Sequence, residues 1–238
     1  MGRNNFFQFK KFRIEQEKAA MKVNTDGVLL GAWTNITSAK SVLDIGAGTG
    51  LISLMIAQRS NAIVTGVEIE KNAAEEARFN VQNSEWNHRI SILHSSFQDF
   101  VETSGNQFDV IVTNPPFFSN SAKNSNPNLS MARHNHLLPF EDIISGSKKL
   151  LEHNGILSLI LPAGAAQEFT EKARHKNLFL NRLTLVKPFP HKEPNRCLME
   201  FGTKQSDRED SIMSVFDETG KDYSSEFKNM ACDFYLKL

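Results

Sequence analysis

The chain has 238 residues, of which 40% are hydrophobic and 23% are charged, a composition that excludes a disordered or fibrous protein. Lysine plus arginine and aspartate plus glutamate both number 27, so the chain has no overall basic field and any surface for nucleic acid must be local. This length suits one large domain that needs no disulfides. The two cysteines form no CxxC pair or Cys/His cluster, so we expect reduced thiols and no bound metal.

The N-terminal segment is basic and rich in phenylalanine. Residues 1–24 hold six basic residues against two acidic ones. The phenylalanines interleaved with them are Phe6, Phe7, Phe9 and Phe12. A helix over Val28–Trp33 is predicted next, with Asp26 in the position of an N-cap. We find neither the apolar core of a signal peptide nor the ~20 apolar residues of a membrane span, so we expect a cytoplasmic protein without a membrane anchor.

Short β-branched runs then alternate with longer helical patterns. The predicted strands are Ser41–Ile45, Ala62–Glu68, Ile90–Leu93, Phe108–Thr113 and Gly155–Leu161. The predicted helices between them are Leu51–Arg59, Lys71–Asn83 and Phe140–Glu152. This alternation, with strands that are continuously apolar, is typical of an α/β fold with a parallel sheet.

The later part of the chain differs in composition. Residues 118–136 are rich in asparagine and serine, which predicts a loop, and residues 171–196 hold seven basic residues against two acidic ones. The end of the chain, Asp222–Leu238, has the pattern of a capping helix followed by an aromatic anchor. We therefore expect one domain, made of an N-terminal segment (1–40), a core (41–204) and a C-terminal extension (205–238) packed on the core.

A glycine-rich motif follows the first predicted strand. It runs from Asp44 through Gly46, Ala47, Gly48 and Gly50 to the start of a helix. Glycines let the backbone turn sharply and approach a ligand closely, but the spacing is not that of the dinucleotide fingerprint GxGxxG. An acid at Asp44 would repel pyrophosphate and suits a cationic ligand such as S-adenosylmethionine. Glu68 ends the next strand, where a carboxylate can accept hydrogen bonds from ribose hydroxyls.

The strand Phe108–Thr113 runs into Asn114, Pro115, Pro116 and Phe117. Two consecutive prolines make the loop rigid and remove two backbone N–H donors. The carbonyl oxygens of the loop are then expected to point outward, where they can accept hydrogen bonds. The Asn114 amide oxygen and the Pro115 carbonyl can each accept one N–H of an exocyclic amino group, while Phe117 can stack on the target ring. We therefore expect these four residues to be catalytic, by positioning and hydrogen-bond acceptance.

These motifs together resemble a known family. The strand–glycine loop–helix–strand–Glu unit is similar to that of the class I S-adenosylmethionine-dependent methyltransferases, and NPPF resembles the [DNS]PP[YFW] signature of amino-methyltransferases. With the run from Met21 to Trp33, they resemble the bacterial valine-tRNA adenine-37 N6-methyltransferase family over nearly the whole chain. This resemblance implies a Rossmann-like, mostly parallel seven-stranded sheet with helices on both faces and an antiparallel last strand near Cys197–Thr203. It also implies S-adenosylmethionine as the cofactor.

The resemblance also implies roles for individual residues. Thr25 and Asp26 would cap a helix over the methionine end of the cofactor, although Asp26 as a plain N-cap explains its presence as well. Backbone contacts are expected at Gly46, Ala47, Gly48 and Gly50, a ribose contact at Glu68, and a further cofactor contact at Ile69. Where many relatives place an acid near the adenine, this chain has Ser96 and Phe97; Phe97 either sandwiches the adenine or is a core aromatic.

The expected substrate is the anticodon loop of tRNA, bound by a monomer. Candidate contacts to RNA phosphates are Lys10, Lys11, Arg13, Arg133, Lys192 and Arg196, with the N-terminal phenylalanines offering stacking. For any one of these residues, solvated surface charge is an equal alternative. Three other functions stay open. They are methylation of guanine N2 in ribosomal RNA, methylation of a release-factor glutamine at N5, and RNA binding without catalysis.

Overall fold

The computed structural model describes residues 4–19, 21–116 and 138–238. Its centre is an eight-stranded sheet in which every strand except β9 runs in the same direction. In spatial order the strands are β10 (Glu209–Ser214), β8 (Phe179–Lys187), β9 (Arg196–Gly202), β7 (Leu151–Pro162), β6 (Phe108–Thr113), β3 (Ser41–Ile45), β4 (Ile63–Glu68) and β5 (Ile90–His94). The parallel α/β fold and the antiparallel strand near Cys197 are therefore confirmed.

The sheet has one strand more than the seven predicted. This strand, β10, pairs in parallel with β8 at the edge of the sheet. Only its last two residues, Met213 and Ser214, are buried. Because an edge strand with four exposed residues shows no clear apolar alternation, its sequence gives little signal for a strand.

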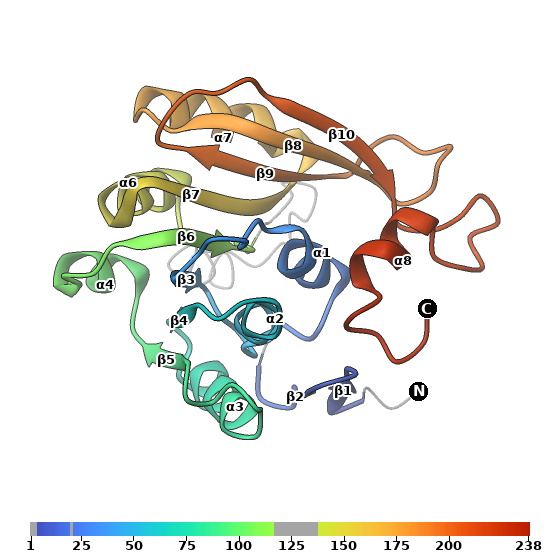
Figure 1. Ribbon diagram of the computed structural model, residues 1–238, viewed down its shortest axis with the longest axis horizontal. Helices are drawn as coiled ribbons and strands as arrows, with labels where there is room; N and C mark the ends of the chain where they lie inside the picture. The colour runs from blue at the N-terminus through green and yellow to red at the C-terminus, as the bar shows by residue number, and fades with distance from the viewer. Residues whose placement is uncertain (1–3, 20, 117–137) are drawn as a thin grey trace, which may run out of the picture.

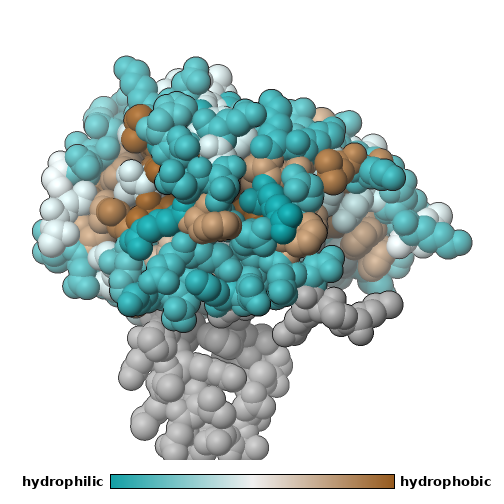
Figure 2. Space-filling view, turned by 90° about the horizontal axis from the view of Figure 1, so that it is seen from below, coloured by the Kyte–Doolittle hydropathy of each residue, from teal (hydrophilic) through white to brown (hydrophobic). Residues whose placement is uncertain are grey.

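Helices cover both faces of the sheet, as predicted (Figure 1). One face carries α1 (Thr25–Trp33), α2 (Leu51–Arg59), α3 (Lys71–Gln82) and α8 (Ser225–Ala231). The other carries α4 (Phe97–Thr103), α6 (Phe140–Leu150) and α7 (Ala163–His175). Seen from below, the surface is mainly hydrophilic, and its hydrophobic residues lie in separate groups (Figure 2).

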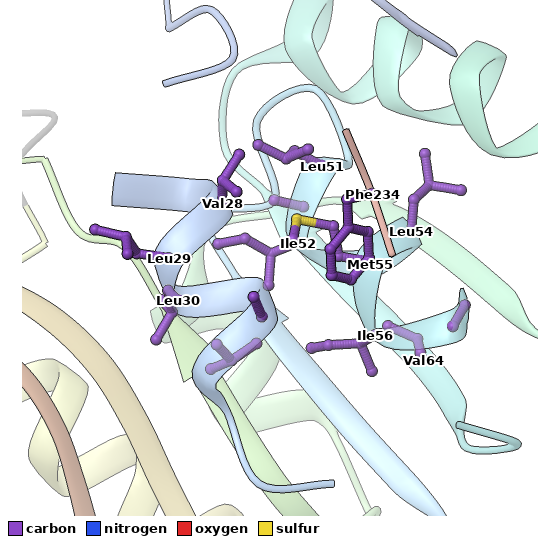
Figure 3. Packing of buried hydrophobic residues seen from close by; sticks show 14 of the residues in the cluster. Val28, Leu29, Leu30, Leu51, Ile52, Leu54, Met55, Ile56, Val64 and Phe234 are labelled. Carbon is purple, nitrogen blue, oxygen red and sulfur yellow. The ribbon is translucent and has the colours of Figure 1, made fainter. Parts of the chain in front are cut away.

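The first of these faces is held by close packing of α1 on α2. Figure 3 shows Val28 of α1 beside Leu51 and Ile52 of α2, with Phe234 from the end of the chain near Met55. Phe234 is fully buried, so the predicted C-terminal anchor is confirmed. At the start of α1 the N-cap is Asn24, whose side chain accepts from the Gly27 N–H. The prediction that Asp26 is the N-cap was wrong, because Asp26 lies in the first turn.

The N-terminal segment forms a hairpin of β1 (Phe6–Gln8) and β2 (Arg13–Glu15). Phe9 and Phe12, which flank its turn, are buried in the core shared with α1 and α2. The hairpin thus anchors the start of the chain to its end, and Phe9 contacts Tyr235 edge to face. The predicted stacking of these two phenylalanines on RNA is wrong, since neither ring reaches the surface.

Candidate functional site

A cavity of about 280 Å³ opens at the carboxyl ends of β6, β3 and β4, three neighbouring strands of the sheet. In open α/β sheets this edge is where ligands bind. The structure brings eight of the predicted site residues into its wall: Gly46, Gly48, Glu68, Ile69, Phe97, Asn114, Pro115 and Pro116. Residues from separate motifs, up to 70 positions apart in the chain, therefore share one cavity.

The glycine loop turns through left-handed backbone conformations at Gly46, Gly48 and Gly50. A Cβ at Gly46 would meet nothing within 4 Å, so it is the left-handed conformation that requires glycine there. The N–H groups of Gly46 and Ala47 donate to Val67 O, and that of Gly50 donates to Ala47 O. Because these N–H groups are used inside the protein, the loop suits a cationic ligand better than a phosphate.

Glu68 fixes the rim of the cavity at the end of β4. Its carboxylate accepts the Gly48 N–H at 2.8 Å and the Glu70 N–H at 2.9 Å, and the residue is 8% exposed. These two bonds hold the carboxylate in one orientation against the cavity. A carboxylate oriented in this way is suited to accept hydrogen bonds from a vicinal diol.

Asp44 lies behind the loop and is completely buried. Its Oδ2 accepts the Ser53 hydroxyl at 2.6 Å, while its Oδ1 has no hydrogen-bond partner among the described residues. Burial raises the pKa of the Asp44 carboxyl to about 6, against hydrogen bonds from Ser53 that lower it; repulsion from Glu68 adds a smaller rise. Asp44 does not line the cavity, so any effect of its charge on a ligand acts through the loop.

Asn114 is held beside the glycine loop by the end of β6. The Thr113 hydroxyl donates to Ile45 O at 3.0 Å and so ties β6 to β3 where both strands end. Pro115 is buried and Pro116 is exposed, which fixes the direction in which the chain leaves the sheet. Asn114 is half-buried, and its side chain makes no hydrogen bond to any other described residue. Its amide is therefore available to a ligand.

One wall of the cavity comes from the N-terminal segment, which sequence reasoning missed. Ala19 and Met21 line the cavity. The Glu76 carboxylate on α3 accepts the backbone N–H groups of Glu17, Lys18 and Ala19 at 2.7 to 2.8 Å. No sequence signal joins Glu76 to residues 57 to 59 positions away, because the acceptor is a side chain and the donors are backbone.

Asn80, one turn further along α3, attaches the hairpin to the glycine loop. Its side chain exchanges hydrogen bonds with the backbone N–H and carbonyl of Glu15 in β2, and it also donates to Thr49 O. The residue is 2% exposed. The amide of Asn80 thus connects the N-terminal hairpin to the loop beneath the cavity.

Gln98 is a further cavity residue that the sequence did not reveal. It lines the cavity next to Phe97, and its Nε2 donates to Asp142 of α6 at 2.8 Å. Because a carboxylate oxygen accepts, the Gln98 amide must turn its NH₂ toward Asp142 and its oxygen away. The neighbouring Ser96 lies outside the cavity wall, and its side chain caps α4 by accepting the Asp99 N–H.

Several other predicted cofactor residues do not reach the cavity wall. They are Thr25, Asp26, Asp44, Ala47 and Gly50. Ala47 and Gly50 shape the loop, and Gly50 precedes α2 as its left-handed N-cap. Asp26 pairs with Arg196 at 2.9 Å, so its carboxylate is directed to β9.

Those predicted RNA contacts that the structure describes lie outside the cavity wall, and the protein itself engages some of their side chains and not others. Lys10 donates to Cys232 O at 2.6 Å, and Arg13 pairs with Glu15 at 2.7 Å while lying over the ring of Phe6. Lys11 and Lys192 are exposed, and their side chains have no ion pair within the described residues. Two other predicted residues, Phe117 and Arg133, lie outside the described residues.

The cavity fits S-adenosylmethionine by the chemistry of its wall. Apolar side chains at Phe97, Ile69 and Leu138 suit an adenine ring, and the Glu68 carboxylate suits the ribose. No cluster of three or more histidine, cysteine, aspartate or glutamate side chains suited to a metal occurs in the described part of the chain. Within that part, no helix is long and apolar enough to cross a membrane.

The chain is similar to known proteins over most of its length. Residues 26–176 match the family model of the methyltransferase small domain. The tRNA1(Val) (adenine(37)-N6)-methyltransferase of Trichodesmium erythraeum is 40% identical over 236 residues, which cover 98% of each chain. The protein of the same name from Flavobacterium psychrophilum is 41% identical over 235 residues, covering 98% of this chain and 100% of its own.

Solved structures share the fold. A crystal structure described as a predicted O-methyltransferase, from Agrobacterium tumefaciens, superposes with a TM-score of 0.67 at 21% identity, over 88% of this chain and 96% of that one. The 16S rRNA N2 G1207 methyltransferase of T. thermophilus, solved with AdoMet and guanosine, gives 0.58 at 20% identity, over 84% of this chain and 50% of that one.

Proposed function

The chain belongs to the family of tRNA1(Val) (adenine(37)-N6)-methyltransferases, and from this membership we propose that it methylates the exocyclic N6 amino group of adenine 37 in valine tRNA. The observation that carries the proposal is the cavity in which Glu68, the glycine loop and Asn114 meet. S-adenosylmethionine, when bound there, supplies an electrophilic methyl group on a sulfonium. The residues of the chain then have to bind, orient and desolvate the two reactants.

Glu68 is proposed to bind the cofactor, and Asn114 is proposed to bind the adenine that accepts the methyl group. We propose that the Glu68 carboxylate holds the ribose hydroxyls, with Gly46, Gly48 and Ile69 enclosing the rest of the cofactor. The Asn114 amide oxygen and the Pro115 carbonyl accept the two N–H bonds of the adenine amino group. This arrangement would leave the nitrogen lone pair free to attack the methyl group, with the cofactor's thioether as the leaving group, and the nitrogen would lose its extra proton only after the new bond forms, so that no strong base is required before that. Phe117 is proposed to stack on the target ring.

The proposal extends to RNA binding and to the cell compartment. We propose that Lys11, Lys192 and Arg133 contact phosphates of the anticodon loop, with Lys10 and Arg13 contributing less because the protein already engages them. We propose that the protein binds tRNA as a monomer. A tRNA substrate, reduced cysteines and no membrane-crossing helix in the described residues support a cytoplasmic location.

Nucleoside mass spectrometry tests the proposed function. tRNA and rRNA from a strain that lacks this protein are compared with those from its parent, and purified valine tRNA is also analysed. N6-methyladenosine should disappear from valine tRNA and return when the purified protein and S-adenosylmethionine are added in vitro. Loss of N2-methylguanosine with N6-methyladenosine unchanged would overturn the proposal in favour of a guanine-specific enzyme.

A further inference from the structure

Five aromatic rings form a continuous stack from the core to the surface. Its inner end is Phe227 of α8, and the rings that follow are Tyr223, Phe216, Phe189 and His191. Successive centroids are 4.5 to 5.7 Å apart, and the angle between successive ring planes is at most 26°. Phe227 is 1% exposed, whereas the side chain of His191 is 56% exposed.

The outer rings are held by a rigid loop between β8 and β9. Lys192 N–H donates to Phe189 O, and Asn195 N–H donates to Val186 O. Three prolines at positions 188, 190 and 194 restrict the backbone of the same loop. Gly220 packs against Phe189 so closely that a Cβ there would lie 2.9 Å from the ring. An aromatic platform fixed in this way loses little conformational entropy when another ring is placed on it.

The loop lies at the edge of the sheet where the cavity opens. It joins the carboxyl end of β8 to the start of β9, and β9 is adjacent to β7, the neighbour of β6. Three strand spacings of ~4.8 Å, roughly 14 Å in all, separate the carboxyl end of β8 from that of β6. His191 lies in the loop beyond the end of β8, so an RNA loop that reaches both His191 and Asn114 has to span this spacing and the extent of the β8–β9 loop. Figure 1 shows the β8–β9 loop beside α8.

The net positive charge of the loop favours binding of a polyanion only modestly. Residues 187–196 hold three basic side chains against one acidic, Glu193. Arg196 is paired with Asp26 and Lys187 donates to Pro190 O, so Lys192 is the cation without a partner among the described residues. Glu218 lies 3.6 Å from the His191 ring. The affinity of this surface must therefore come mainly from the exposed ring face.

We propose that the outer face of His191, supported by Phe189, stacks against an unpaired base of the RNA substrate, with Lys192 on the adjoining phosphate. The inference rests on the proposed function, because it takes the methyl-accepting RNA as the occupant. Unpaired loop bases commonly stack on aromatic side chains in proteins that bind RNA. The platform would fix where the RNA loop lies while Asn114 contacts the target base.

The experiment measures tRNA binding and its salt dependence for single variants of the full chain. His191→Ala should raise the tRNA dissociation constant about 5- to 100-fold, the range for loss of one base–aromatic stack, and leave the salt slope unchanged. His191→Tyr should retain binding, because a ring remains. Lys192→Ala should lower the salt slope by ~0.7–0.9. The matched control is His175→Ala, an exposed histidine that ends α7 just before the amino end of β8.

An abasic scan of the anticodon stem-loop then identifies the base. One abasic position should weaken binding to the wild type and have no further effect on His191→Ala. The inference fails if His191→Ala binds like the wild type, if His191→Tyr binds as weakly as His191→Ala, or if no abasic position couples to His191. If the wild type methylates valine tRNA in the same preparation, the proposed function holds and only the inference about His191 has failed.

Discussion

Asp26 and Arg196, 170 positions apart in the chain, form an ion pair in which Oδ2 and Nε are 2.9 Å apart. The pair joins the first turn of α1 to the first residue of β9. From the sequence, Asp26 was assigned to the cofactor and Arg196 to the RNA. The ion pair gives both charges a role within the protein. It holds the start of α1, which follows the cavity-lining residues Ala19 and Met21, close to the loop that carries His191.

The first prediction concerns this pair. In a double-mutant cycle of Asp26→Asn and Arg196→Gln, urea unfolding should give a coupling of about 0.5–1 kcal/mol, because both side chains are about one-third exposed (30% and 34%). Arg196→Gln should also leave the salt slope of tRNA binding unchanged. A drop in that slope by ~0.7–0.9 would return Arg196 to the phosphate contacts.

The second prediction concerns Asn114. Asn114→Ala should lower the rate of methyl transfer by roughly 10²-fold or more, as expected when a hydrogen bond made in the transition state is lost. The affinity for S-adenosylmethionine, measured by calorimetry, should change little. The control is Asn106→Ala, an exposed asparagine in the loop before β6. Wild-type single-turnover rates for Asn114→Ala would remove this residue from the mechanism.

The third prediction uses the pKa of the buried Asp44. Burial raises this pKa from 3.8 to about 6 in the folded protein, so the native state binds the proton more tightly than the unfolded chain. The protonated carboxyl stabilises the fold most fully below pH ~4, and this contribution is lost as pH rises to ~6 and above. The cost of ionisation is on the order of 3 kcal/mol at neutral pH.

Unfolding of the ligand-free protein at several pH values tests this cost. Asp44→Asn removes the ionisation while an amide oxygen can still accept from Ser53. The stability of this variant relative to the wild type should increase between pH 4 and pH 8 by an amount on the order of 3 kcal/mol. Taking the difference between the two proteins cancels the titration of all other groups. A difference that does not vary with pH would show that Asp44 ionises as freely in the native state as in the unfolded chain.

The fourth prediction tests the attachment of the N-terminal wall. Glu76→Gln leaves three backbone N–H groups facing an amide in place of a carboxylate, and we expect S-adenosylmethionine to bind roughly tenfold more weakly. Trypsin should cleave after Lys18 faster in this variant than in the wild type, with S-adenosylhomocysteine present in both. The control is Glu75→Gln, the exposed neighbour on the same helix. Equal cleavage rates in Glu76→Gln and Glu75→Gln would mean that the wall is held by other contacts.

Much of the fold followed from the sequence because the central strands are continuously apolar and the glycine loop and NPP segment are local motifs. The structure brings the Gly46, Glu68 and Asn114 motifs into one cavity, as expected from strands that end at the same edge. The contributions of Ala19, Met21 and Gln98 were missed, because each depends on a distant partner. Those partners are Glu76 for the wall and Asp142 for Gln98, and nothing in the sequence joins either residue to its distant contact.

The additional strand β10 has a consequence for solubility. Without it, the stretch Arg182–Lys187 of β8 would present a row of unpaired backbone groups to other chains, which is the usual starting point of strand-to-strand aggregation. β10 covers that row and presents Glu209 and Asp210 at the new edge, both exposed. Negative charges on a short edge strand oppose the docking of a further strand. The acidic C-terminal extension therefore also protects the sheet from pairing with other copies of the chain.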